Sequence, residues 1–279
     1  MRHLVTQLLF KASSSPGMQK LLDNSLVKAS HFYERNRMRA VAVPDAEQYR
    51  AVYDSLRKEL KVRTGPFAGM KYPRAESAGS ALIPKFLGSY EKELHGEIER
   101  LLAKGYDDVI DVGCAEGYYA IGMAMRLPAA QIYAYDTSDV ACGLCTEMAK
   151  VNGVSERVSV RATCTPETLI QFPKPGKTLI IVDCESYEKV LFTPAVRDAV
   201  KGCDLLIETH DFLDVSISTN LATLFSSTHK ITTVLSVDDI QKAKYYQYPE
   251  LEGLSVQSRF QLLAESRPTL MEWLIMEPL

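Results

Sequence analysis

From Tyr90 onward, short apolar runs alternate with longer segments of helical periodicity. Short runs rich in β-branched residues predict strands, and apolar positions three or four residues apart predict helices. The predicted strands are Asp108–Val112, Gln131–Tyr135, Arg157–Arg161, Thr178–Asp183, Asp204–Glu208, Ile231–Ser236 and Met271–Met276. The predicted helices between them include Tyr118–Arg126, Ser138–Val151 and one that begins at Thr193-Pro194 and ends before Gly202.

This alternation predicts a parallel sheet covered by helices on both faces. The last two predicted strands are separated by a tyrosine-rich stretch around residues 244–249 rather than by a clean helix, so we expect the final strand to run antiparallel. The predicted fold class is therefore α/β, with a Rossmann-like, seven-stranded, mostly parallel sheet and an antiparallel last strand. The tyrosines could line a ligand pocket or form an exposed hairpin tip, and both interpretations stay open.

The N-terminal part of the chain has a different pattern. Helical spacing over residues 18–40 predicts one helix, and Asp45 as N-cap before an apolar stripe from Tyr49 to Leu60 predicts a second. Glycines and prolines then accumulate over residues 64–84, which predicts a long irregular connection that is either a lid or a plain linker. We therefore expect a helical N-terminal extension, residues 1–63, and one domain, residues 64–279.

Composition narrows the class of protein. The 279 residues are 46% hydrophobic and 24% charged, as in an ordinary globular chain. A net charge of -3 lacks the basic excess of nucleic-acid binding proteins, so no nucleic-acid partner is expected. No apolar run approaches the roughly 20 residues of a membrane span, and the run at residues 4–10 is too short and interrupted for a signal peptide.

Six cysteines fall mostly inside apolar or helical patterns, which is typical of free thiols in a reducing compartment. We therefore expect a soluble, cytoplasmic protein, and the N-terminal helices could join two copies into a homo-oligomer.

The first predicted strand leads into a glycine loop, Asp111-Val112-Gly113-Cys114-Ala115-Glu116-Gly117. In open α/β sheets, ligands bind at the carboxyl ends of the strands. A dinucleotide-binding loop would have glycine at 113, 115 and 118, but Ala115 and Tyr118 stand at two of these positions. The carboxylate of Asp111 would repel phosphate and attract a cation. The loop therefore favours a sulfonium ligand, S-adenosylmethionine, over a nicotinamide dinucleotide.

The second predicted strand ends at Asp136, which follows the last loop glycine, Gly117, by 19 residues. An acid about 20 residues after such a loop accepts hydrogen bonds from ribose hydroxyls. Asp136, with Thr137 beside it, is therefore the second predicted contact of the methyl donor. The alternative is that the glycines only make turns and Asp136 only ends a strand.

Two acidic clusters follow the fourth and fifth predicted strands. Asp183-Cys184-Glu185-Ser186-Tyr187-Glu188 and Glu208-Thr209-His210-Asp211 should meet at the same edge of the sheet. Carboxylates next to a histidine can supply a general base near neutral pH, so Asp183 and His210 are the candidate bases. In the alternative interpretation, Asp183 and Glu208 cap helices and His210 packs in a loop. A divalent cation on Asp183, Glu185, Glu208 and His210 is a third alternative, but no metal is predicted.

The segment from about Gly65 to the C-terminus resembles the FkbM-like class of S-adenosylmethionine-dependent methyltransferases. The resemblance rests on Asp111 to Tyr118, on Asp183 to Glu188 where that class has Asp-x-Glu-Gly-x-Glu, and on Glu208-Thr209-His210. Gly88-Ser89-Tyr90-Glu91 also resembles a segment of that class near the donor, which adds Glu91 to the predicted donor contacts. Ser186 departs from the glycine of the pattern and puts the backbone of that loop in question.

The resemblance implies methylation of an acceptor hydroxyl, often on a sugar or a secondary metabolite. The predicted donor-binding residues are Glu91, Asp111, Gly113, Gly117, Asp136, Thr137 and Asp183, and the predicted catalytic residues are Asp183, Glu185, Glu208 and His210. The expected acceptor is a small molecule or a glycan. The alternatives are an N-methyltransferase of the same fold, a donor-binding subunit without activity, and a nicotinamide-dependent reductase, which the glycine spacing disfavours.

Overall fold

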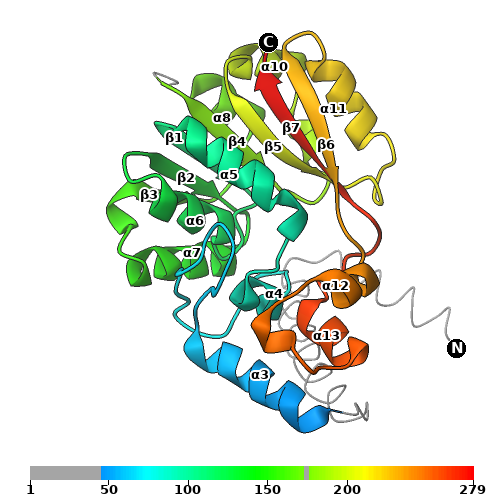
Figure 1. Ribbon diagram of the computed structural model, residues 1–279. Helices are drawn as coiled ribbons and strands as arrows, with labels where there is room; N and C mark the ends of the chain where they lie inside the picture. Colours follow the sequence, from blue (N-terminus) through cyan, green and yellow to red (C-terminus); the bar gives the residue numbers. More distant parts are fainter. Residues whose placement is uncertain (1–44, 173–175) are drawn as a thin grey trace, which may run out of the picture. The chain divides into compact units, whose positions relative to one another are not determined.

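The computed structural model describes residues 45–172 and 176–279. The predicted helix over residues 18–40 and the other residues before 45 lie outside this range. Residues 47–279 form one compact unit, which is described here (Figure 1). Within the described residues, no helix is both long enough and apolar enough to cross a membrane.

A seven-stranded sheet forms the centre of this unit, in the order β3-β2-β1-β4-β5-β7-β6. The strands are β1 (Asp108–Val112), β2 (Gln131–Tyr135), β3 (Val158–Arg161), β4 (Thr178–Val182), β5 (Asp204–Thr209), β6 (His229–Leu235) and β7 (Glu272–Pro278). β1 to β5 pair in parallel, whereas β7 runs antiparallel to both β5 and β6. The predicted fold class is confirmed, including the antiparallel last strand.

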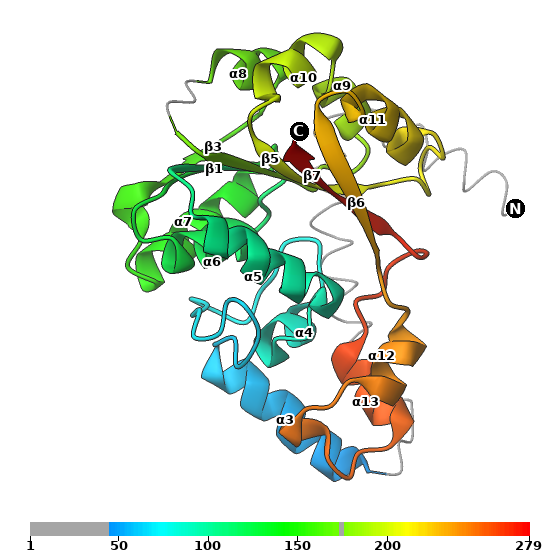
Figure 2. The same cartoon turned by 45° about the horizontal axis from the view of Figure 1, so that its top comes forward.

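Helices cover both faces of the sheet (Figure 2). On one face lie α5 (His95–Lys104), α6 (Tyr118–Arg126) and α7 (Asp139–Val151), and on the other lie α8 (Pro166–Gln171), α9 (Glu188–Leu191), α10 (Pro194–Val200) and α11 (Ile217–Phe225). β1 and β4 are buried along their whole length, as expected for central parallel strands covered on both sides. Ser138 and Thr193 cap α7 and α10 through their side chains, which fixes where these helices begin.

The prediction that no clean helix separates the last two strands is wrong. Between β6 and β7 the chain forms two helices, α12 (Asp239–Tyr245) and α13 (Val256–Leu263), which pack on each other. The pattern was missed because each helix has only about two turns, too few for a clear apolar period. We call residues 237–270 the helical insertion.

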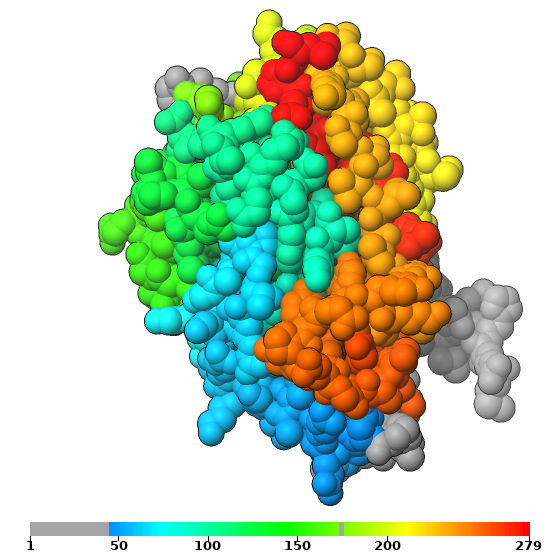
Figure 3. Space-filling view, viewed as in Figure 1, coloured from blue at the N-terminus to red at the C-terminus, as the bar shows by residue number. Residues whose placement is uncertain are grey.

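The helical insertion packs against the segment that precedes the sheet. That segment contains α3 (Ala46–Glu59) and α4 (Leu82–Leu87), and α13 contacts α4. Gln48 on α3 donates to the carbonyl of Glu252 at 2.8 Å, and Arg63 pairs with Glu250 at 3.0 Å. Figure 3 shows the insertion in orange beside this segment in blue and cyan. The short 3₁₀ helices η1 (Lys92–Leu94), η2 (Ser155–Arg157) and η3 (Pro249–Leu251) complete the described elements.

Candidate active site

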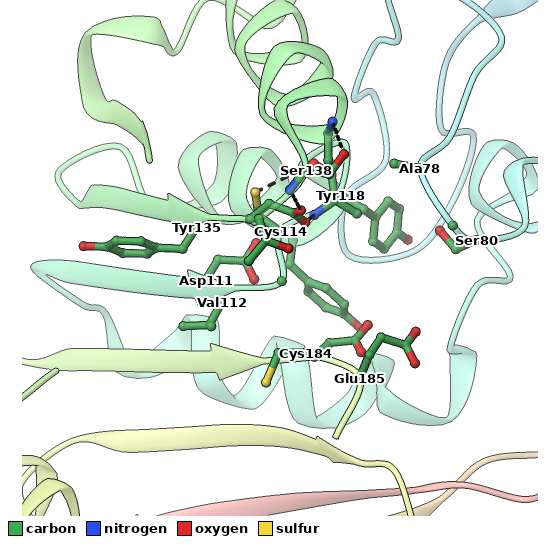
Figure 4. A pocket seen from close by; sticks show the side chains of 18 of the residues that line it. Ala78, Ser80, Asp111, Val112, Cys114, Tyr118, Tyr135, Ser138, Cys184 and Glu185 are labelled. Atoms are coloured by element: carbon green, nitrogen blue, oxygen red, sulfur yellow. Dashed lines mark hydrogen bonds between the residues drawn. The ribbon is translucent and has the colours of Figure 1, made fainter. Parts of the chain in front are cut away.

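A cavity of about 570 Å³ opens at the carboxyl edge of the sheet, where the loops after β1, β2 and β4 meet (Figure 4). Its volume is in the range of small-molecule sites. Of the predicted site residues, six line it: Asp111, Gly113, Asp136, Thr137, Asp183 and Glu185. The remaining predicted residues, Glu91, Gly117, Glu208 and His210, lie outside the lining.

Gly113 brings the ends of β1 and β4 together. Its φ is +85°, and a Cβ at this position would lie 1.7 Å from the carbonyl oxygen of Asp183. Only glycine fits so close an approach. Gly117 has a φ of +98° and lies behind the cavity, where a Cβ would be 2.8 Å from the thiol of Cys145. The first glycine therefore shapes the cavity, and the second lets the start of α6 pack on α7.

Asp136 is held at the cavity by backbone amides. Its Oδ2 accepts from the N–H of Ala115 at 2.9 Å, and its Oδ1 accepts from the N–H of Ser138 at 2.8 Å. Each carboxylate oxygen has a further lone pair, so the side chain can still accept hydrogen bonds from a ligand. This geometry suits the ribose contact that the spacing from Gly117 predicts, with Thr137 exposed beside it.

Asp111 is a buried carboxyl group at the end of β1. Burial, with the nearby charge of Asp183, raises its pKa to about 8. Its Oδ2 is buried and has no hydrogen-bond partner among the described residues. A cationic ligand in the cavity would stabilise the ionised form of this group.

Three carboxylates surround His210. We call Asp183, Glu185, Glu188 and His210 the acceptor edge, after the role that the sequence predicts for the two loops that carry them. The Nδ1 of His210 lies 2.9 Å from Glu188, and its Nε2 lies 3.4 Å from Asp183 and 3.6 Å from Glu185. Burial alone would lower the pKa of His210, but hydrogen bonds to Asp183 and Glu188 outweigh it and raise this pKa to about 10. The ring is therefore an imidazolium near neutral pH and has no free lone pair with which to take a proton. Of the two candidate bases, this leaves Asp183.

The acceptor edge is also where a metal ion could bind. Asp183, Glu185 and His210 each offer one ligand atom, and these three atoms lie within 4.8 Å of one another. Glu208, the fourth ligand that the sequence suggests, is not part of this group. The His210 imidazolium already supplies a positive charge between the carboxylates.

The loop that carries Glu185 has left-handed backbone at two positions that are not glycine. The φ of Glu185 is +53° and that of Ser186 is +77°. The Asp-x-Glu-Gly-x-Glu pattern has glycine at the position of Ser186. Glycine adopts left-handed backbone without strain, whereas Ser186 adopts it with some strain. The departure from the pattern thus leaves the course of the loop unchanged.

Glu91 and Glu208 lie in a second cluster, around Arg267. The guanidinium of Arg267 pairs with Glu91, with Glu208 and, at 3.0 Å, with Glu265, which also pairs with Lys242 of the helical insertion. Burial raises the pKa of Glu91 to about 7 although Arg267 opposes this, and burial likewise raises the pKa of Glu208. Both side chains are thus engaged by protein groups, and the cluster fastens the insertion to the edge of β5.

Comparisons with known proteins find similarity around the first strands of the sheet. Residues 96–182 match the family model described as ribosomal protein L11 methyltransferase (PrmA). The release factor glutamine methyltransferase of Chlorobaculum tepidum is 40% identical over 82 residues, which cover 28% of this chain and 27% of that protein. This part of the chain is therefore similar to class I methyltransferases. The chain spans about a quarter of the length of this curated relative.

Solved structures of methyltransferases also match this chain, at low sequence identity and with TM-scores below 0.5. An S-adenosylmethionine-dependent O-methyltransferase from Thermotoga maritima is 14% identical, with 71% of each chain covered and a TM-score of 0.44. A precorrin-6y C5,15-methyltransferase from Geobacter metallireducens is 16% identical, with 66% of this chain and 88% of that chain covered and a TM-score of 0.44.

The family match ends at Val182, the last residue of β4. It therefore includes Asp111, the glycine loop and Asp136, but neither Asp183 nor any residue after it. The match thus includes the predicted donor contacts Asp111 and Asp136 and stops before the cluster around His210.

Several residues at or near the cavity were not predicted from the sequence. Lys85 and Glu116 form a buried ion pair at the cavity, and Tyr90 and Tyr118 line it. A signal for Lys85 existed, because it is the one charged residue in the apolar run Leu82–Leu87. The contacts of Arg267 with Glu208 and Glu91 gave no local signal, because these residues lie 59 and 176 residues away along the chain.

Proposed function

We propose that this protein transfers the methyl group of S-adenosylmethionine to an acceptor hydroxyl on a small molecule or glycan, in the manner of the FkbM-like class. The observation that carries the proposal is one cavity with donor-type residues at Asp111 and Asp136 and a carboxylate, Asp183, at its other side. The family match over residues 96–182 supports the donor part, and the FkbM-like pattern over Asp183 to Glu188 supports the acceptor part.

The donor part of the proposal fits the residues present. Asp136 offers its remaining lone pairs to the ribose hydroxyls, and Asp111 offers an unpartnered buried oxygen to the positive end of the donor. Gly113 leaves room for the donor above the loop, since a side chain there would meet β4. When bound, S-adenosylmethionine supplies an activated methyl group on a sulfonium.

In the proposed reaction, Asp183 accepts the proton of the acceptor hydroxyl as the oxygen–methyl bond forms and the methyl–sulfur bond breaks. A hydroxyl is a weak nucleophile near neutral pH, so removal of its proton in the transition state is the step that needs a protein group. The His210 imidazolium holds Asp183 from one side, while Glu188 holds His210 from the other. These residues also keep the acceptor in line with the methyl group, which is the other requirement of this displacement.

N-methylation is the second candidate, and two observations favour it. The curated relative is by its name a glutamine methyltransferase. Three carboxylates against one imidazolium also leave the acceptor edge with a net negative charge, which would attract an amine in its cationic form. A neutral amine needs no base, so under this candidate Asp183 would bind the acceptor and not deprotonate it.

The test separates the donor from the acceptor. Calorimetry with S-adenosylhomocysteine and, in parallel, with NADH should show binding of the first alone, and binding of NADH alone would overturn the donor assignment. Labelled S-adenosylmethionine is then incubated with panels of hydroxyl and amine acceptors, with and without a chelator. We expect label on hydroxyls in both conditions. Label on amines only would replace O-methylation by N-methylation, and binding of S-adenosylhomocysteine without turnover on any acceptor would favour a donor-binding subunit.

A further inference from the structure

Glu116 lies in the glycine loop, but its side chain is engaged by residues that precede the sheet. Its side chain is only 1% exposed. Its carboxylate accepts from the hydroxyls of Tyr72 and Ser77 at 3.2 and 3.0 Å, from the N–H of Ala78 at 3.0 Å and from the ammonium of Lys85 at 2.5 Å. All four donors belong to residues 72–85, which precede the sheet. We call these residues the wall segment.

Lys85, at the end of the wall segment, is just as deeply buried, at 2% exposure. Besides Glu116, its ammonium donates to the hydroxyls of Ser80 at 2.6 Å and Ser77 at 3.3 Å. It also lies 4.8 and 5.2 Å from the ring centroids of Tyr90 and Tyr118, within the range of cation–π attraction. The ion pair is therefore fully enclosed and joins the wall segment to the glycine loop.

The wall segment forms one end of the cavity. Ala78, Gly79 and Ser80 line it, and Figure 4 shows Ala78 and Ser80 beside Tyr118. The residues that follow β3, among them Thr163 and Cys164, also line the cavity, next to Asp136 on the neighbouring strand β2. Since Asp136 is the proposed ribose contact, the β3 side takes the adenine, and the wall segment faces the methionine end of the donor.

We propose that Lys85 and Glu116 are a positioning pair, which holds the wall segment against the glycine loop and so completes the donor site at its methionine end. The inference rests on the proposed function for the identity of the donor. A buried ion pair is a weak means of stabilising a fold, because desolvation of the two charges offsets most of their attraction. At the cavity, the Lys85–Glu116 pair instead makes the position of residues 77–80 depend on Glu116 in the glycine loop.

The experiment compares Lys85→Met, Glu116→Gln and the double variant with the wild type. In each single variant we expect the Kd for S-adenosylhomocysteine and the KM for the donor to rise about tenfold or more, because the contact that holds the wall segment against the glycine loop is lost, and we expect the Tm to fall, because one buried charge is left unpaired. The kcat at saturating donor should stay within about threefold, since neither residue touches the acceptor edge. Hydrogen exchange of the Ala78 amide, which donates to Glu116, should accelerate more than exchange of the amides in β1 and β4.

The double variant separates positioning from stability. It leaves no unpaired buried charge, so its Tm should recover toward the wild type while its Kd for S-adenosylhomocysteine stays high. Recovery of both Tm and Kd would overturn the proposal, and so would single variants with unchanged Kd and unchanged exchange at Ala78. If the single variants do not fold, Glu116→Asp and Lys85→Arg keep the charges but change their reach, and they are measured in the same way.

The matched control is Arg74→Met. Arg74 also belongs to the wall segment and pairs with Glu147 on α7, but both side chains are exposed by more than 40%. Exposed pairs contribute little, so the Kd should change by less than about threefold. If the wild type does not bind S-adenosylhomocysteine, the proposed function fails, whereas the exchange of Ala78 still reports on the positioning pair.

Discussion

The cavity and the Arg267 cluster near β5 hold their acidic residues in different ways. At the cavity, Asp136 is fixed by backbone amides 21 and 2 residues away along the chain. In the Arg267 cluster, which lies outside the cavity lining, Glu208 and Glu91 are fixed by the side chain of Arg267, which lies 59 and 176 residues away from them. Asp136 is thus held by backbone geometry, and Glu91 and Glu208 are held by long-range side-chain contacts.

This difference has a chemical reason. Backbone amides stay in place when side chains change, so they suit contacts to a ligand of fixed structure. Side-chain clusters can be replaced one residue at a time, which suits an edge that must match a particular acceptor. The family match over residues 96–182 includes Asp136 but none of Glu91, Glu208 and Arg267.

The largest effect should come from Asp183, the proposed base at the cavity. Asp183→Asn keeps the size of the side chain but cannot accept the proton, so kcat should fall by about 10²- to 10⁴-fold. The Kd for S-adenosylhomocysteine should change little, which calorimetry checks. Glu185→Gln is the control, because that side chain is 79% exposed and should affect kcat much less. Full activity of Asp183→Asn would move the reaction away from this carboxylate.

An intermediate effect is expected for Asp136→Asn on the donor side. The carboxylate of Asp136 can accept hydrogen bonds from two backbone N–H groups and from the ribose, whereas the amide of Asn has only one accepting oxygen. A hydrogen bond to a charged group contributes about 1.5–3 kcal/mol. The KM for the donor should therefore rise about 10- to 100-fold, with kcat at saturating donor nearly unchanged. Steady-state kinetics measures both. A fall in kcat alone would contradict the role of Asp136 as a donor contact.

The smallest effect concerns the pH dependence of stability and tests the acceptor edge without any substrate. The pKa of His210 in the folded protein, about 10, lies above its ordinary value near 6.5. The His210 imidazolium should therefore add its full contribution to the free energy of unfolding below about pH 6.5. This contribution should be lost as the pH rises through about 10. The difference in Tm between the wild type and His210→Gln should therefore shrink over this range.

His229 provides the opposite case for this measurement. Burial lowers its pKa, so its contribution should be present above about pH 6.5 and be lost on acidification. The Tm difference between the wild type and His229→Gln should accordingly shrink toward acidic pH. The same slope for both variants would show that the acceptor edge does not hold His210 as a cation.

The sequence predicts the donor side well for the same reason that this side is built locally. The strand bounds of β1 and β2, the glycines of the loop between them and the position of Asp136 all follow from spacing within about 30 residues. Convergence of Asp183, Glu185 and His210 also follows, because parallel strands end at a common edge. The Arg267 cluster and the Lys85–Glu116 pair depend on tertiary packing, for which periodicity carries no signal. The two helices of the insertion are too short for a clear pattern.

The helical insertion leaves and rejoins the sheet at one point. The N–H of Ser236 donates to the carbonyl of Met271 at 2.8 Å, and the N–H of Met271 donates to the hydroxyl of Ser236 at the same distance. The register of β6 and β7 is thus closed before the insertion begins. The hydrogen bonds of the sheet therefore do not depend on the length of residues 237–270, so a change of length there would act first on the Arg267 cluster and on the contact with α4.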